Sequence, residues 1–237
     1  MEMKRPALYL LIILLLANMG CWSKMNGSNH KEIDFLPAGR ILVLGFRPAI
    51  SQIGKSVAFR SPVSGSVFMA EYVSLDVADK MTDKLFNMLL DFKDYNMISP
   101  KSRDWDTSGR MSNELVENNL KAYMEMGRAF STDAIMVGYI YRWRERKGGE
   151  YSVDRPASVA FDLYLIRSED GSVIWKGKYD KTQNPLSENV LDLETFLKGK
   201  GKWMTVDELA QIGMVEMMKS LPLRPGSGKY PDPPSKK

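Results

Sequence analysis

The chain has 237 residues and is mildly basic, with 33 Lys and Arg, 29 Asp and Glu, and a formal net charge of +4. These charges are interspersed, so the composition gives no case for a nucleic-acid partner. The single cysteine excludes an intramolecular disulfide, and the single histidine, His30, excludes a histidine triad and a multi-histidine metal site. Neither a metal nor another cofactor is expected.

Residues 1–20 have the pattern of a secretory signal peptide. Lys4 and Arg5 give a positive start, and eleven apolar residues follow from Ala7 to Ala17. A helix of that length measures about 16 Å, roughly half of the hydrocarbon thickness of a bilayer. The segment is therefore predicted to direct export rather than to span a membrane.

Gly20-Cys21 closes this segment and resembles the cleavage site of a bacterial lipoprotein, in which the cysteine thiol receives a diacylglycerol. The resemblance implies lipidation of Cys21. Because Trp22 and not aspartate follows the cysteine, it also implies an outer-membrane lipoprotein that faces the periplasm. Two alternatives are an ordinary secretory cleavage site beside a lone cysteine and an uncleaved signal anchor.

The remaining chain divides into three parts. Residues 21–37 are polar and predict a flexible tether, and residues 222–237 combine prolines, glycines and lysines in a pattern typical of a disordered tail. Residues 38–221 are long enough for one domain with a core.

The first half of this domain alternates strands with helices. Residues 40–46 are apolar and rich in β-branched side chains, as in a strand buried on both faces, and residues 61–68 could form a small hairpin. Ser74 is the expected N-cap of a helix with apolar residues at spacings of three and four, running to Phe92. Residues 95–99 predict a short strand.

A second helix is expected over residues 112–130, with Gly127 allowing a close approach to the sheet. Strands follow at 134–144, 157–166 and 173–179, the last two joined by an Asp-Gly turn. We expect Tyr139, Tyr141 and Trp143 to share one face of the first of these strands. Two helices end the domain, at 188–197 and 205–221, the second starting from a Thr-Val-Asp-Glu capping box with Leu209, Ile212 and Val215 or Glu216 on its apolar side.

The element order is thus β-α-β-α-β-β-β-α. Strand–helix–strand units make the first strands parallel, and the Asp-Gly turn makes the last pair antiparallel. The predicted fold class is α/β, a single domain with a mixed, partly antiparallel sheet and packed helices.

Two segments together resemble a family of envelope proteins. Asp133-Ala134-Ile135-Met136-Val137-Gly138 follows a helix end, and Asp170-Gly171-Ser172-Val173-Ile174-Trp175 forms a turn and a strand. Both are similar to junctions in the family that includes the N-terminal domain of TolB, CsgG and LpoB. The resemblance implies a fold and an envelope location over roughly residues 40–220, and it implies no active site. Channel-forming members carry two long membrane hairpins, whereas the corresponding inserts here, 47–72 and 145–156, are short or polar.

Candidate catalytic groups are few. Two carboxylate pairs are candidates for hydrolysis, Asp104 with Asp106 and Asp192 with Glu194. No supporting sequence pattern surrounds either pair. The leading hypothesis is therefore a non-enzymatic, lipid-anchored envelope protein that binds a protein or a cell-wall component. The alternatives are an oligomeric secretion-channel component of the CsgG type and, third, an envelope hydrolase.

The expected partner-binding surface is the connection 145–156, which is longer than a hairpin needs. It carries Arg146, Tyr151 and Arg155 beside a Gly-Gly pair. Two guanidinium groups and one aromatic ring suit an acidic or planar partner. The equally simple alternative is a tolerated surface insertion.

Overall fold

The computed structural model describes residues 39–50, 52–90, 96–99, 120–184 and 202–222. All of them belong to one compact unit, Phe35–Lys237, and the unit Met1–Asp34 lies outside the described residues. The signal peptide, Cys21, the tether, the second helix before Leu120, the 188–197 helix, the 223–237 tail and both carboxylate pairs also lie outside them. The predictions for these segments stay predictions.

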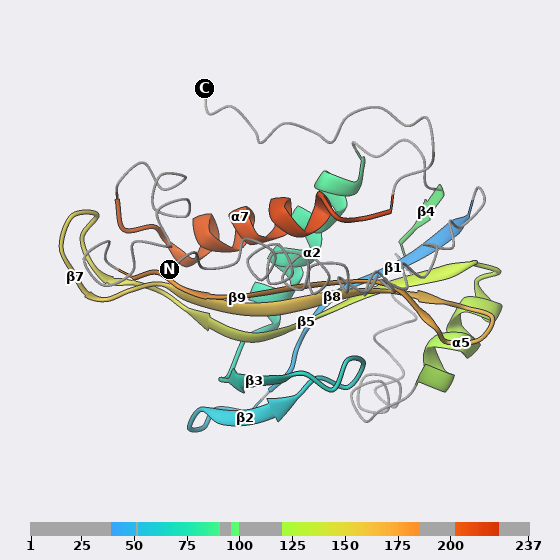
Figure 1. The fold of residues 1–237 in the computed structure, drawn as a ribbon, viewed down its shortest axis with the longest axis horizontal. Coiled ribbons are helices and arrows are strands. Elements are labelled where there is room, and N and C mark those ends of the chain that lie inside the picture. The colour runs from blue at the N-terminus through green and yellow to red at the C-terminus, as the bar shows by residue number, and fades with distance from the viewer. Residues whose placement is uncertain (1–38, 51, 91–95, 100–119, 185–201, 223–237) are drawn as a thin grey trace, which may run out of the picture. The chain divides into compact units, whose positions relative to one another are not determined.

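The centre of the fold is a five-stranded sheet in the order β4-β1-β5-β8-β9 (Figure 1). Its strands are β1 (Arg40–Pro48), β4 (Asn96–Ile98), β5 (Ala134–Arg144), β8 (Ser158–Arg167) and β9 (Val173–Thr182). β1 pairs in parallel with β4 and β5, whereas β5–β8 and β8–β9 are antiparallel. With α2 (Leu75–Leu90), α5 (Leu120–Ala129) and α7 (Val206–Met218), the sheet reproduces the order β-α-β-α-β-β-β-α. The predicted fold class is confirmed.

Helices α2 and α7 cover one face of the sheet (Figure 1). Leu75 follows the predicted cap Ser74, and every third or fourth residue of α2 is buried against β1: Ala78, Met81, Leu85 and Leu89. Gly45 lets α2 come close, since its φ is +75° and a Cβ there would overlap the Thr82 side chain. The Thr82 hydroxyl accepts the Phe46 amide proton at 2.8 Å across this contact.

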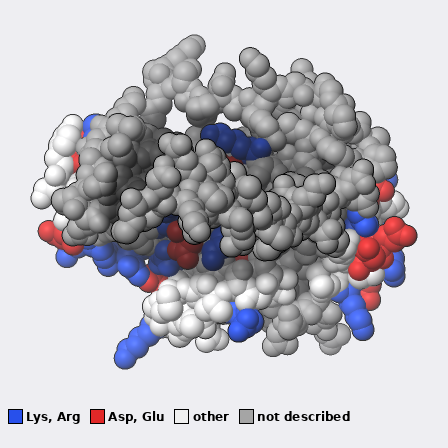
Figure 2. Space-filling model, viewed as in Figure 1, with Lys and Arg blue, Asp and Glu red and all other residues white. Residues whose placement is uncertain are grey.

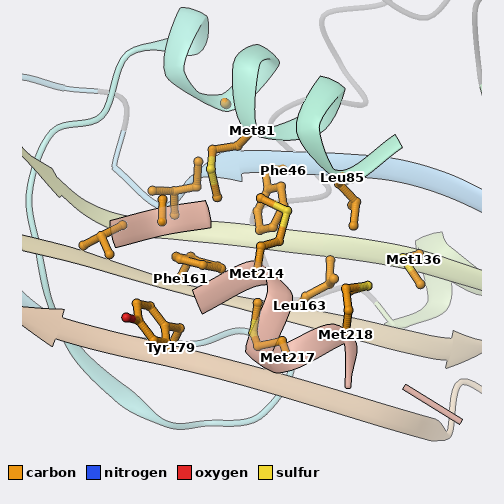
Figure 3. Packing of buried hydrophobic residues seen from close by; sticks show 14 of the residues in the cluster. Phe46, Met81, Leu85, Met136, Phe161, Leu163, Tyr179, Met214, Met217 and Met218 are labelled. Carbon is orange, nitrogen blue, oxygen red and sulfur yellow. The ribbon is translucent and has the colours of Figure 1, made fainter. Parts of the chain in front are cut away.

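Helix α7 has the predicted capping box, in which Thr205 accepts from the Glu208 amide and Glu208 accepts from the Thr205 amide. The predicted apolar side was partly wrong, because Ile212, Val215 and Glu216 are only half-buried. Of the predicted residues only Leu209 is fully buried, and the helix also buries Ala210, Gly213, Met214, Met217 and Met218. Gly213 lies against the ring of Tyr179, where a Cβ would overlap it. Figure 3 shows Met214, Met217 and Met218 of the same helix within the buried cluster.

The other face carries α5 and the small hairpin of β2 (Val57–Arg60) and β3 (Val67–Ala70) (Figure 1). A hairpin forms where one was predicted, but its bounds differ: the strands extend outside residues 61–68, and residues 61–66 are its turn. Gly127 of α5 lies against Ser168, where a side chain would overlap, so its predicted role in close packing is confirmed.

One prediction for β5 was wrong. The pairing of β5 with β8 shifts between Ile140 and Arg142, so that Trp143 packs against the cluster beneath α2 and α7. Tyr139 and Tyr141 belong to the opposite cluster, beneath the hairpin. A β-bulge changes which face the following side chains occupy, and the alternating pattern alone does not reveal it.

Candidate functional site

The predicted binding connection forms a short hairpin of its own, with β6 (Lys147–Gly148) paired to β7 (Val153–Arg155). Gly148 has a φ of +111°, a backbone conformation that favours glycine, and the Gly149 amide donates to the Ser152 carbonyl at 2.7 Å. The Gly-Gly pair therefore lies in a defined, hydrogen-bonded turn.

This β6–β7 hairpin is braced by the segment that leads into α7. The Trp203 amide donates to the Glu150 carbonyl at 2.8 Å, and Lys202 Nζ lies 2.6 Å from Glu150 Oε2. The Arg146 guanidinium donates to the Trp203 carbonyl. Glu145 Oε1 accepts from the first α7 amide, Val206 N, at 3.2 Å. Four links thus join two segments about fifty residues apart.

The neighbouring Gln183 holds the same segment from inside. It is buried, donates to the Lys202 carbonyl at 2.9 Å and accepts from the Met204 amide at 2.8 Å. Lys202 also lowers the pKa of Glu150 through a hydrogen bond and charge attraction, and Glu150 raises the pKa of Lys202 in return. Both side chains are well exposed, so this pair contributes little stability and mainly sets the position of the hairpin.

The three predicted binding residues differ in their exposure and contacts. Arg146 is half-buried and engaged with the backbone of Trp203, so its guanidinium fixes the fold of this region. Tyr151 is 79% exposed at the turn, and Arg155 is exposed on β7 opposite Lys147. Lys202, which was not among the predicted residues, places its ammonium 5.7 Å from the Tyr151 ring centre.

Lys202 could have been found from the sequence only in part. The run Lys198-Gly199-Lys200-Gly201-Lys202-Trp203 stands out as basic, but nothing local connects it to residue 151. Long-range pairing of the two segments is what brings this cation and the aromatic ring together.

A second polar site lies under the β2–β3 hairpin, around the buried side chain of Asp162. Its Oδ2 accepts from the Ser61 hydroxyl at 3.0 Å and the Tyr141 hydroxyl at 2.8 Å, and the Tyr164 hydroxyl donates to the same oxygen. Among the described residues its Oδ1 has no hydrogen-bond partner, and the Tyr139 backbone lowers the pKa of the carboxyl.

Burial is the main influence on this carboxyl and raises the pKa of Asp162 to about 6, while the hydrogen bonds from Tyr164, Tyr141 and Ser61 oppose that rise. Burial also raises the pKa of Tyr141 and Tyr164, with the nearby Asp162 charge adding to the shift. A raised carboxyl pKa is common in active sites. Here, however, the carboxyl is closed off from solvent and its hydroxyl partners tie a hairpin to the sheet, which is a structural arrangement.

The aromatic and basic side chains of β5 likewise make contacts within the domain. Arg142 Nε donates to Ser158 Oγ at 2.6 Å, and its Nη2 lies 2.6 Å from Asp180 Oδ1. Arg144 forms an ion pair with Glu71. These arginines therefore do not form an exposed stacking platform with the neighbouring aromatic rings.

Within the part of the chain that the structure describes, no three His, Cys, Asp or Glu side chains come together as a metal site. No helix in those same ranges is long and apolar enough to cross a membrane.

No protein-family model matches the sequence, and no curated protein matches it. Solved structures with a similar arrangement include the PelC dodecamer from Paraburkholderia phytofirmans, 16% identical over 65% of this chain and 80% of that chain, with a TM-score of 0.36. Lipoprotein GNA1162 from Neisseria meningitidis is 14% identical over 68% of this chain and 96% of that chain, with a TM-score of 0.35.

The C-terminal domain of LpoB from Salmonella enterica is also among them, at 14% identity over 63% of this chain and 87% of that chain, with a TM-score of 0.33. LpoB is one of the proteins named in the sequence resemblance. At these identities and TM-scores, none of the three assigns the chain to a family or gives it a function.

Proposed function

We propose that this chain is a non-enzymatic lipoprotein of the bacterial outer membrane, anchored through Cys21, whose periplasmic α/β domain binds a protein or a cell-wall component. The N-terminal pattern of charged, apolar and small residues before the cysteine supports the anchor. One observation supports the binding role above the others. Tyr151 is 79% exposed on a hairpin that is itself held firmly in place.

An exposed aromatic ring on an ordered hairpin suits binding for a thermodynamic reason. Much of the cost of association is the ordering of loops and side chains at the interface. Here the Trp203 amide already donates to the Glu150 carbonyl, and the Arg146 guanidinium donates to the Trp203 carbonyl, so the free protein holds the hairpin in place. Tyrosine and arginine are also the residues that most often contribute strongly to binding free energy.

The charges around the ring favour an acidic or planar partner. Glu150 is paired with Lys202, so Arg155 and Lys147 are the neighbouring cations that β6 and β7 present to solvent. We define the binding surface as Lys147, Tyr151, Arg155 and Lys202. Arg146 is left out because its guanidinium is engaged with Trp203.

The channel alternative fits the hairpin β2–β3 less well. Its two strands have four residues each, whereas a strand that crosses a bilayer needs about 9–11. Residues 57–70 would have to leave the sheet and extend before they could form a pore. Detergent-resistant rings seen by electron microscopy would support this alternative over the proposal.

The anchor is tested by metabolic labelling with palmitate. We expect label on the natural chain and none on Cys21→Ala, since the chain has no other cysteine. Label retained in the variant, or no label on the natural chain, would contradict a lipid anchor without bearing on the binding surface.

The binding surface is tested by affinity purification from solubilised envelopes. The double variant Tyr151→Ala/Arg155→Ala is expected to lose the partners that the natural chain retains. Val173→Ala is the matched control, because Val173 is 40% exposed and lies at the opposite end of β9 from Thr182. Equal recovery of partners with both variants would contradict the assignment of this surface.

A further inference from the structure

The outward face of the β2–β3 hairpin is apolar and uncovered. Val67 and Met69 are 52% and 51% exposed, and the register places Arg60 and Ala58 beside them on the same face. Ile53, in the segment that leads into β2, is 86% exposed. A single exposed apolar residue is common on protein surfaces, whereas a group of them on one face marks an interaction site. We therefore expect this face to bind something.

The inward face of the same hairpin fixes its position on the domain. The Phe68 ring stacks on Tyr141 with ring centres 3.8 Å apart and planes 5° from parallel. The Met69 carbonyl accepts from Arg142 Nη1 at 3.3 Å, and the turn residue Ser61 donates to Asp162. The outward apolar side chains are therefore presented on a rigid support.

Charge distinguishes this hairpin from the rest of the surface. Between Arg40 and Ala70 the sequence holds four basic residues and no acidic one. Lys55, two residues before β2, and Arg60, the last residue of β2, are both exposed. Figure 2 shows the same region, below the sheet in this view, as largely white with Lys or Arg side chains projecting at its margin.

The size of the face limits what it can bind. Two strands of four residues cover roughly 13 Å by 10 Å, far less than the about 800 Å² per partner of a standard protein interface. A second copy or a folded protein partner would gain little area here. Binding to a bilayer surface does not require a large contact area. Each apolar side chain that enters the membrane interface, and each cation that contacts a lipid phosphate, adds to the binding free energy.

We propose that the outward face of the β2–β3 hairpin rests on an anionic lipid surface. Ile53, Val67 and Met69 enter the boundary between headgroups and acyl chains, while Lys55 and Arg60 contact lipid phosphates. The contact is peripheral, since strands of four residues are too short to cross a bilayer. It goes beyond the proposed partner binding and does not depend on lipidation of Cys21.

The test uses a fluorescent probe sensitive to polarity on the full chain in the Cys21→Ala background, where Val67→Cys provides the only thiol. Flotation separates vesicles that carry the chain from unattached chain, so attachment is measured independently of the probe. Val173→Cys is the matched control at a half-exposed apolar position on β9. Met69→Cys is a second probe in case the first variant misfolds.

On vesicles that contain phosphatidylglycerol, we expect the Val67→Cys probe to shift to shorter wavelength and the Val173→Cys probe to stay unchanged. Replacing Lys55 and Arg60 by glutamine should weaken the shifted state about fivefold for each residue, as expected for the loss of one cation near an anionic surface. High salt should act in the same direction.

Three results would overturn the proposal. They are an unshifted Val67→Cys probe on vesicles that carry the chain, an equal shift at both probe positions, and a shift that appears without vesicles and rises with protein concentration. The last would identify a second copy of the chain as the occupant. A failed lipid anchor, in contrast, would show in the palmitate experiment and leave these probe signals as they are.

Discussion

Acidification from about pH 7.5 to about pH 5 is expected to stabilise the domain through Asp162. Burial raises the pKa of this carboxyl to about 6 in the folded state, against 3.8 as its ordinary value. The folded state therefore binds the proton more tightly than the unfolded chain does. The stabilisation is fully present below the unfolded pKa and is lost as the pH rises through the folded pKa.

These two pKa values give a gain of about 1.4 kcal/mol in the free energy of unfolding between pH 7.5 and pH 5. Glu150 and Asp170 have lowered pKa values, so both stay ionised in the folded state at pH 5, and only the onset of protonation in the unfolded chain opposes the gain slightly. The contribution of Asp162 to the free energy of unfolding is therefore measured by comparison with a variant in which only this carboxyl is replaced.

The variant Asp162→Asn serves this purpose, because its amide oxygen can still accept from Ser61, Tyr141 and Tyr164 but does not titrate. We expect the difference in unfolding free energy, natural chain minus variant, to grow by about 1.4 kcal/mol from pH 7.5 to pH 5 in urea denaturation followed by tryptophan fluorescence. Parallel pH profiles for the two chains would refute the reasoning. So would a difference that shrinks on acidification, which would mean that the native site favours the charged carboxylate.

Three further changes, measured by the same denaturation, test the packing. Gly45→Ala should cost about 2–4 kcal/mol, from a positive φ and overlap with Thr82, and a loss below 1 kcal/mol would contradict that close contact. Thr205→Ala should cost about 1 kcal/mol through the lost N-cap of α7, and an unchanged stability would mean that the capping box is not formed. Phe68→Ala should cost about 3–5 kcal/mol, whereas its exposed neighbour Val67→Ala should cost under about 0.5 kcal/mol; similar values for both would place the hairpin away from the sheet.

The sheet and its order could be predicted because strong local patterns specify them. Residues 40–46 and 134–137 are apolar on both faces, and the Asp170-Gly171 turn joins two alternating runs. The Thr205 capping box also marked the start of α7 correctly, because the motif is complete within four residues. Patterns that depend only on neighbouring residues therefore predicted these elements correctly.

What the sequence concealed depends on contacts between distant residues. The bulge after Ile140 puts Trp143 on the other side of the sheet from Tyr139 and Tyr141, and the close approach of Gly213 to Tyr179 adds Gly213 to the buried side of α7. The Asp162 site was missed because a lone carboxyl in an alternating strand looks solvent-facing, while the hydroxyl of Ser61 comes from a hairpin a hundred residues earlier.

The candidate binding surface also combines residues that the sequence indicated with one that only the fold brings into place. Tyr151 and Arg155 were identifiable from the length and composition of one connection. The role of Arg146 and the approach of Lys202 were not, since both follow from the pairing of Glu150 with residues 202 and 203.

Site-specific photo-crosslinking in living cells tests the central claim most directly. A photoreactive residue replaces Tyr151 in the lipid-anchored chain, and a second chain carries it at Val173 as the control, because both positions are exposed. The account predicts a discrete crosslinked product in the membrane fraction from position 151 and none from position 173. No product from 151, or the same product from both positions, would contradict partner binding by the β6–β7 hairpin.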